Sequence, residues 1–484
     1  MWRRLFLLSW AGACAAPPES SSKTASITVI PSEGPMSGRT AVQVGLPDGL
    51  LGTDIVGVRL GMADGRGLAG LAVEQDGDTL RFVDQGSAEA GPSEVVLLTE
   101  DGDEHAFPNA FTHLPAADPV FHRMAALGAS LTQGVQGGVP TERGMLNSPG
   151  AVLARQAGGF LPLPLLVPDL FPSIEATDIG PAPGCEVPGV TDFVTAAAVD
   201  VLGQLSNDDG VDLSLGRQDP TLPAWHVAVG GAKVADVVDG PDSGDFAGQF
   251  LSRLVYAPEV PLEGELGPGQ LERVVAAAPT LVLSTDMAGN DVILPLTKPG
   301  PIDLSQLTPH AEVADHIEIA VETLASTGAE VFLATLPRPT LLPLAVDKKR
   351  RLIAEGEDAE AVQAVFDSVD ALAEDNNAVL VAEAARYDNV HIVDLAAVTE
   401  AIDAEGVQVG DALLWPGKLG GLISTDGVHF SDVGYALTAN AFIDEINAVM
   451  GVSVPQVELG DVAATDPYHP DALRLKGLDP TLCE

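Results

Sequence analysis

Positively charged residues are scarce in this sequence, which has 24 lysines and arginines against 69 aspartates and glutamates and a formal net charge of −45. A surface this acidic repels the phosphates of nucleic acids, so a nucleic-acid partner is excluded. Long apolar runs are also missing after residue 20, where no stretch approaches the roughly 18 residues that span a bilayer. The apolar fraction is still 46%, and 484 residues allow about two to four folded domains.

The first 16 residues have the order of a signal peptide: a basic start, a short apolar stretch and small residues before a cleavage point. Residues 11–14, Ala-Gly-Ala-Cys, resemble the lipobox of bacterial lipoproteins, although that family usually has Leu where Ala11 stands. The resemblance implies lipidation of Cys14, and ordinary cleavage within residues 11–16 is the alternative. We expect an exported protein, either secreted or held by this lipid in the bacterial cell envelope, at the outer membrane or surface. The lipid would be its only membrane contact.

Cysteine is rare, and Cys14, Cys185 and Cys483 are the three in the sequence. If Cys14 is lipidated, the other two form an even pair in an oxidising compartment. A Cys185–Cys483 disulfide would tie the C-terminal tail to a Pro-rich loop. We predict this disulfide, with two unpaired cysteines as the alternative.

Residues 17–26 are polar and aperiodic, as in a flexible tether, and residues 27–115 have an all-β pattern. Strands are predicted at residues 40–44, 55–60, 79–83 and 94–98, among others. Asp-Gly and Gly-Asp turns between short runs predict a small sandwich. The opening Ile-Pro-Ser-Glu-Gly-Pro-Met-Ser-Gly and the closing Asn-Ala-Phe-Thr-His resemble the IPT/TIG family of immunoglobulin-like domains. The resemblance implies a spacer, or a module that contacts a polysaccharide or protein at the cell surface.

From about residue 119 to residue 455, strands alternate with helices, which predicts an α/β domain with a doubly wound parallel sheet. Its clearest unit is a helix followed by a buried strand at residues 331–335. The apolar face of that helix carries Val313, Ile317, Val321 and Leu324. Residues 355–386 predict a pair of Ala-rich helices, residues 161–223 an insertion over one end of the sheet, and residues 456–484 an ordered but irregular tail.

A candidate nucleophile follows the first predicted strand of this domain. The sequence has no Gly-x-Ser-x-Gly elbow, which disfavours an ordinary α/β-hydrolase. Residues 125–129 instead form a short apolar run that ends in Gly-Ala and is followed at the turn by Ser130. A serine in this position is more often a helix cap than a nucleophile when taken alone.

An Asp-x-x-His spacing lets a carboxylate and an imidazole converge on a nucleophile, and it occurs three times. The copy with Asp426 and His429 lies between a Gly-rich segment and an amphipathic helix, so we assign it to the site. His391 opens an apolar strand and is predicted to be a core residue at the strand edge. His469 lies in an acidic, Pro-flanked tail and is predicted to be in a solvated loop.

Two further strand ends carry candidate oxyanion donors. The run at residues 225–229 ends in paired glycines, where the Gly231 N–H could approach a ligand closely. The run at residues 279–285 leads to Gly-Asn-Asp, and Asn290 would place an amide at the same sheet edge. Each of these segments alone is most often just a turn.

Together and in this order, the four segments resemble the signature blocks of the SGNH (GDSL-type) lipase/esterase superfamily, over about residues 121–455. The resemblance implies a flavodoxin-like, three-layer α/β/α fold and a serine carboxylic ester hydrolase that works through an acyl-enzyme on Ser130. Asp426 and His429 complete the triad, and Ser130, Gly231 and Asn290 form the oxyanion hole. The ester substrate is the expected partner. No cofactor is implied, and no cluster of residues with ligand spacing suggests a metal.

The sequence departs from the family at two positions: Ala129 stands where the family usually has Asp, and His226 where it has Asn. Ala129 keeps a second hypothesis open, namely a surface binding or adhesion lipoprotein whose hydrolase domain is degenerate. A carbohydrate O-deacetylase on the same fold is a third, because it would share every catalytic residue. The lipid, short-chain or sugar nature of the ester is not readable from the sequence.

Overall fold

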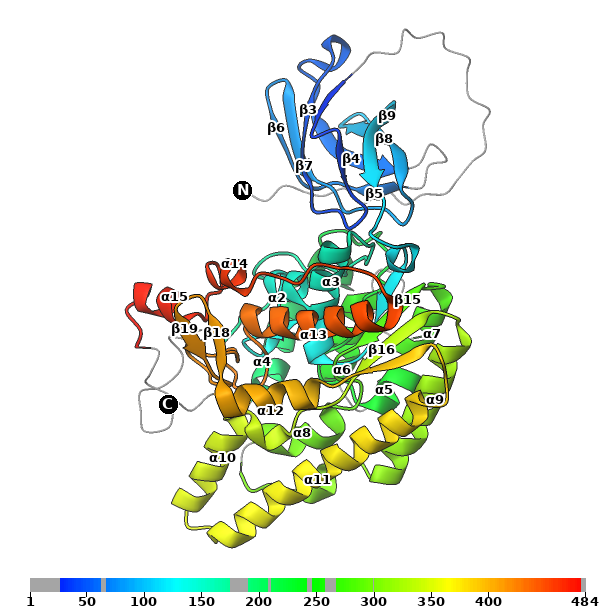
Figure 1. The fold of residues 1–484 in the computed structure, drawn as a ribbon. Coiled ribbons are helices and arrows are strands. Elements are labelled where there is room, and N and C mark those ends of the chain that lie inside the picture. Colours follow the sequence, from blue (N-terminus) through cyan, green and yellow to red (C-terminus); the bar gives the residue numbers. More distant parts are fainter. Residues whose placement is uncertain are drawn as a thin grey trace.

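The chain forms two structural units, which the computed structural model places one above the other in Figure 1. An all-β unit ends with residue 114, and an α/β unit follows from residue 119. The structure describes residues 27–61, 67–174, 190–207, 210–241, 246–256, 267–298 and 300–479. The predicted signal peptide with Cys14, the predicted tether, and both Cys185 and Cys483 lie outside the described residues, so the signal peptide, the lipidation and the disulfide stay predictions.

The described residues of the all-β unit form two sheets that enclose one core. The first sheet has the order β1 (Thr28–Ile30), β3 (Ala41–Gly45), β7 (Thr79–Val83), β6 (Leu71–Asp76). The second has the order β2 (Glu33–Pro35), β9 (Glu104–Leu114), β8 (Gly91–Thr99), β4 (Ile55–Gly61), β5 (Gly67–Ala69). Inward-facing residues of both sheets, such as Val42 and Phe111, are buried together. The predicted sandwich is therefore present, and each of the four strand predictions above falls on an observed strand.

The sandwich packs directly against the α/β unit. Leu71 of β6 is buried in the hydrophobic cluster of the α/β unit and not in the core of the sandwich. Next to it, Gln85 Nε2 donates a hydrogen bond of 2.6 Å to Asp219 Oδ2 in the α/β unit. The interface thus combines apolar burial with a polar contact.

A parallel sheet lies at the centre of the α/β unit. Its order is β10 (Met124–Ala126), β15 (Leu281–Ser284), β16 (Glu330–Ala334), β17 (Val390–Val393), with every pair parallel. The backbone at His226 adds a parallel bridge to Ala126 on the other side of β10. Numbered along the chain, the five segments have the order 2-1-3-4-5, which is a common doubly wound order.

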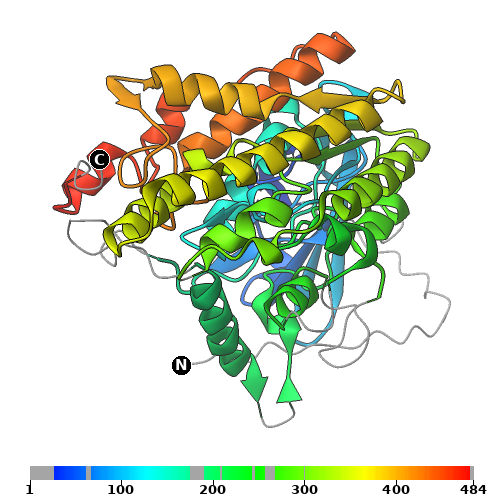
Figure 2. The same cartoon turned by 90° about the horizontal axis from the view of Figure 1, so that it is seen from below.

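Helices cover both faces of this sheet. Successive residues of each strand point to opposite faces, and the apolar side chains on both faces are buried under helices. Leu281 and Leu283 of β15 pack in the cluster of α3 (Pro149–Ala157) and α13 (Asp432–Met450). Val282 packs in the opposite cluster. That cluster is formed by helices that include α5 (Val234–Asp239), α6 (Phe246–Tyr256), α7 (Gln270–Ala276) and α9 (His310–Ser326). Figure 2 shows the same helices from below, wrapped around the sheet.

The structure corrects one helix prediction and confirms another. Residues 355–386 do not form a pair of helices, because one uninterrupted helix, α11 (Ala359–Ala384), fills this region. The chain break lies earlier, where Gly356 has a φ of 99° after α10 (Pro343–Ala354) and Asp358 caps α11. The helix–strand unit at residues 311–335 is present as α9 and β16.

The tail and the insertion contain helices that the sequence did not predict. His469 is not in a solvated loop: it is buried and caps α15 (Pro470–Leu475). The described part of the insertion includes α4 (Val190–Gln204) and a core segment in which Leu166 and Phe171 are buried. Among the helices of the described segments, none is both long and apolar enough to cross a bilayer.

The position of Leu71 predicts that the two units support each other's stability. Leu71→Ala should lower the free energy of unfolding by about 2–5 kcal/mol, because it leaves a cavity in the core of the α/β unit. Urea denaturation followed by near-ultraviolet circular dichroism measures this. Val56→Ala is the control, because Val56 is 61% exposed on the sandwich and should change stability by less than about 0.5 kcal/mol. Equal effects of the two substitutions would contradict the shared core.

Candidate active site

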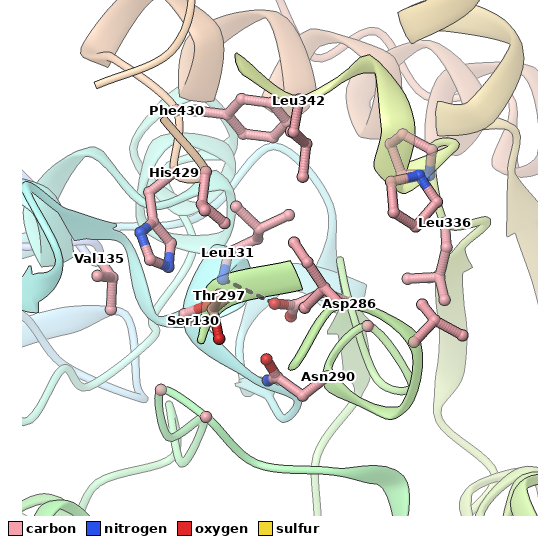
Figure 3. A pocket seen from close by; sticks show the side chains of 18 of the residues that line it. Ser130, Leu131, Val135, Asp286, Asn290, Thr297, Leu336, Leu342, His429 and Phe430 are labelled. Carbon is pink, nitrogen blue, oxygen red and sulfur yellow. Dashed lines mark hydrogen bonds between the residues drawn. The ribbon is translucent and has the colours of Figure 1, made fainter. Parts of the chain in front are cut away.

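A cavity of about 660 Å³ opens at the carboxyl ends of the parallel strands. Four of the five residues selected from the sequence line it, from four separate segments: Ser130, Gly231, Asn290 and His429. Figure 3 shows Ser130, Asn290 and His429 around one part of the cavity, with Leu131, Leu336, Leu342 and Phe430 nearby. Most of the remaining lining is apolar.

Ser130 reaches the cavity because the chain turns sharply after β10. Gly128 has a φ of 135°, which side chains with a Cβ rarely adopt. A Cβ at Gly128 would also lie 2.7 Å from Thr132 Oγ1 and 2.8 Å from Ser284 Oγ. Glycine is therefore required at this turn, and Ser130 becomes the first residue of the short helix α1 (Ser130–Gln133).

His429 is oriented by Asp426, which is completely buried behind it. His429 Nδ1 lies 2.8 Å from Asp426 Oδ2, so Nδ1 donates this hydrogen bond and Nε2 is left to accept a proton. The same carboxylate accepts hydrogen bonds from the backbone N–H groups of Gly138, Val428 and His429. Burial acts to raise the pKa of Asp426, but the His429 imidazole and these donors outweigh it and lower the pKa below its usual value. Asp426 is thus held ionised.

Gly231 and Asn290 are held together on the other side of Ser130. Gly231 has a φ of 86°, and a Cβ there would meet no atom within 4 Å, so its backbone faces open space. Asn290 begins α8 (Asn290–Thr297), and its Nδ2 donates a hydrogen bond of 2.9 Å to the carbonyl of Ala232. Gly230 N donates to Gln133 Oε1 at 2.8 Å, which ties this loop to α1. The two predicted oxyanion donors are therefore fixed relative to the serine turn.

The sequence did not identify Asp286, which lines the same cavity and contacts the serine turn. Its carboxylate is 3% exposed and accepts hydrogen bonds from the backbone N–H groups of Ala129, Leu131 and Thr132, at 3.0, 2.7 and 3.1 Å. Figure 3 marks the bond from Leu131. Gln270, also missed, bonds both the N–H and the carbonyl of Gly128. One feature of the sequence could have indicated Asp286: it is a carboxylate that follows β15, the strand next to β10.

The comparison with protein families agrees with this arrangement. The family model described as GDSL-like Lipase/Acylhydrolase matches residues 124–442, from the first residue of β10 into α13. The chain belongs to the GDSL-like lipase/acylhydrolase family. A search of curated proteins finds no match. Membership of this family supports a hydrolase, and the matched region contains all five residues selected from the sequence.

The GDSL-like domain offers no place for a metal within its described residues, where no group of three or more His, Cys, Asp or Glu side chains could hold one. The other two Asp-x-x-His copies of the chain lie away from the cavity. His391 is in β17, as predicted, and pairs with Glu330 at 2.8 Å. His469 is in the tail described above.

His226, the second departure from the family, supports the serine turn. It is 1% exposed, and its Nε2 donates a hydrogen bond of 2.9 Å to the Thr132 carbonyl. Burial lowers the pKa of His226 to about 4, against a small opposing effect of that hydrogen bond. The folded protein therefore keeps this imidazole neutral where an unfolded chain would protonate it near pH 6.5.

This pKa predicts how stability depends on pH. Between about pH 6.5 and pH 4 the unfolded chain binds a proton that folded His226 does not, so stability falls as the pH falls, by roughly 3 kcal/mol in total. His226→Gln keeps an amide donor but does not titrate, so it should lose this share of the dependence. Urea unfolding of both proteins at pH 7.5 and pH 4.5 measures the difference. Parallel curves for the two proteins would contradict the assignment.

Proposed function

We propose that this protein is an exported carboxylic ester hydrolase in which Ser130 is the nucleophile. The observation that carries the proposal is the Asp426–His429 pair, whose imidazole faces the cavity that Ser130 also lines. Family membership supports hydrolysis by this domain, and the order of the four segments supports the assignment of each role.

The reaction follows from the properties of these side chains. A serine hydroxyl is a weak nucleophile near neutral pH, so His429 Nε2 removes its proton as Ser130 Oγ attacks the ester carbonyl. Asp426 keeps Nδ1 protonated and stabilises the imidazolium that forms. His429 then donates the proton to the departing alcohol, which leaves an acyl-enzyme on Ser130. Water, activated by the same imidazole, releases the carboxylic acid and restores the serine.

The oxyanion of the tetrahedral intermediate has three candidate donors. These are the backbone N–H groups of Ser130 and Gly231 and the side-chain amide of Asn290. One N–H of the Asn290 amide bonds Ala232, which fixes the group and leaves the second N–H for the substrate. Donors fixed before the reaction stabilise the developing charge without reorganising, which is where their catalytic effect comes from.

The lining of the cavity favours an ester with an apolar acyl chain over a small acetyl group. The residues around Ser130 include Leu131, Val135, Leu342 and Phe430, and the volume of about 660 Å³ is large enough for a drug-sized ligand. Leu166 and Phe171 of the insertion are buried in the core and do not line this cavity. The acyl chain would thus bind between the sheet edge and the segments before α10.

The sandwich is proposed to be an immunoglobulin-like IPT/TIG module, in line with its two packed sheets. Leu71 of the sandwich is buried in the core of the α/β unit, so we assign the sandwich a role in supporting that unit. The IPT/TIG resemblance is the basis for the second role that we propose, contact with a surface polymer. The signal sequence supports export, by secretion or through a lipid on Cys14.

Replacement of the serine tests the proposal. Ser130→Ala should abolish the hydrolysis of p-nitrophenyl esters and labelling by a fluorophosphonate probe, because both need an activated serine. Ser368→Ala, an exposed serine of α11, is the matched control and should keep both activities. A series of esters from acetate to palmitate should show a preference for longer acyl chains. Undiminished hydrolysis by Ser130→Ala would refute the mechanism.

The oxyanion assignment gives a separate prediction. Asn290→Ala should lower kcat by roughly 10²–10³-fold and change KM little, because the lost hydrogen bond is made mainly in the transition state. Steady-state kinetics on the best ester of the series measures both constants. A rise in KM with kcat unchanged would instead assign Asn290 to ground-state binding.

A further inference from the structure

We infer that Asp286 positions the nucleophile. It lies in the turn after the neighbouring strand β15 and caps the helix α1, which the side chain of Ala129 cannot do. This inference rests on the proposed function of Ser130. Asp286 does not touch the reacting atoms in this scheme. It acts by fixing the backbone on both sides of the serine.

The need for such a group follows from the position of Ser130. Ser130 is the first residue of α1, and Ala129 is its N-cap. The first N–H groups of a helix have no partner within the helix, and a cap residue such as Asp or Ser normally accepts hydrogen bonds from the second and third of them. Ala129 has no side chain that can do so, and the helix has no side-chain cap at that position.

The carboxylate of Asp286 takes those same donors. In α1 the second and third helical residues are Leu131 and Thr132, and the N–H groups of both donate to Asp286, at 2.7 and 3.1 Å. The N–H of Ala129 donates to the same carboxylate at 3.0 Å. Donors before and after Ser130 thus converge on one side chain, and Ser130 between them is left facing the cavity.

Thr132 locks this arrangement a second time. Its hydroxyl donates a hydrogen bond of 2.7 Å to Asp286 Oδ1 and accepts one of 2.9 Å from the N–H of Thr285. The turn after β10 is therefore bonded to the turn after β15 through both backbone and side chain. These strands are parallel neighbours, so their carboxyl ends meet at one sheet edge.

The same geometry explains how the chain departs from its family at position 129 without losing the carboxylate. An Asp at the N-cap would accept the N–H groups of Leu131 and Thr132 locally, and here Asp286 accepts them from across the sheet edge. The hypothesis of a degenerate, non-catalytic domain rested on Ala129 together with the IPT/TIG-like domain, and Asp286 removes the first of these grounds. We therefore expect an active enzyme whose positioning carboxylate has moved to another strand.

Relocation of the carboxylate tests this inference in the full-length protein. Asp286→Ala should lower kcat on a p-nitrophenyl ester by about 10²-fold with KM within about threefold, because a small displacement of the nucleophile costs that much. The rate constant of fluorophosphonate labelling should fall in parallel. The acidic limb of the pH profile should remain, because Asp286 does not transfer a proton in the reaction. Ala129→Asp combined with Asp286→Ala should restore kcat to within about tenfold of the wild type.

Two further variants separate positioning from general stability. Asp303→Ala removes an exposed carboxylate that caps another turn, at Ser305 and Gln306, and should leave kcat unchanged. Asp286→Asn keeps the shape of the side chain but turns an amide donor toward backbone donors, so kcat should again fall by at least tenfold. This variant decides the question if Asp286→Ala does not fold.

Each outcome has one reading. Wild-type kcat in Asp286→Ala or Asp286→Asn would overturn the inference. Failure of Ala129→Asp to recover any activity lost in Asp286→Ala would overturn the capping role. Loss of the acidic limb of the pH profile in Asp286→Asn would make Asp286 an acid–base group and not a positioning residue. Failure of the proposed function itself looks different, since Ser130→Ala would then retain the activity of the wild type.

Discussion

The hydrogen bond from His429 to Asp426 is the interaction on which the arrangement of the site depends. A fully buried carboxylate is costly unless several donors surround it, and Asp426 has donors from two segments far apart in the chain. One donor is the N–H of Gly138, in the hairpin of β11 (Val135–Gln136) and β12 (Val139–Pro140) that follows α1. Another is the N–H of Val428, in the same loop as Asp426 and His429. The hydrogen bonds of this buried carboxylate are therefore complete only when the hairpin and the loop are packed together, so the orientation of the base depends on the fold around it.

The same solution recurs at other helix starts of the α/β unit, where a buried carboxylate from a distant segment accepts the first N–H groups. Asp291 accepts from Val234 at the start of α5, and Asp466 accepts from Val433 at the start of α13. Burial raises the pKa of Asp291, and it raises that of Asp466 to about 6 together with the neighbouring Asp432 charge. In this acidic chain, some carboxylates are therefore buried and hold helix starts to distant segments, whereas most of the others that the structure describes lie on the surface.

Much of the local structure was predictable from the sequence, because turn residues and apolar periodicity act over a few residues. The strands of the sandwich and the α9–β16 unit follow from such signals. The choice of Ser130, Gly231, Asn290 and His429, which line one cavity, came instead from the resemblance of four segments, in order, to the blocks of a family. Asp286 and the burial of His469 do not, because each depends on which segments become neighbours in space. A carboxylate between two strand ends looks like any turn residue until the order of the strands is known. The helical pair predicted at residues 355–386 was wrong, because residues 359–384 contain no Gly or Pro that would end a helix and one helix spans them.

The burial of Leu71 in the core of the α/β unit has a mechanical consequence. A module joined only by a linker can swivel, and whatever it holds then samples every direction relative to the catalytic domain. Here the sandwich packs against the α/β unit through Leu71, and Gln85 hydrogen-bonds Asp219 at the same interface. If the sandwich binds a polymer, as proposed above, the bound polymer would therefore keep one orientation relative to the cavity.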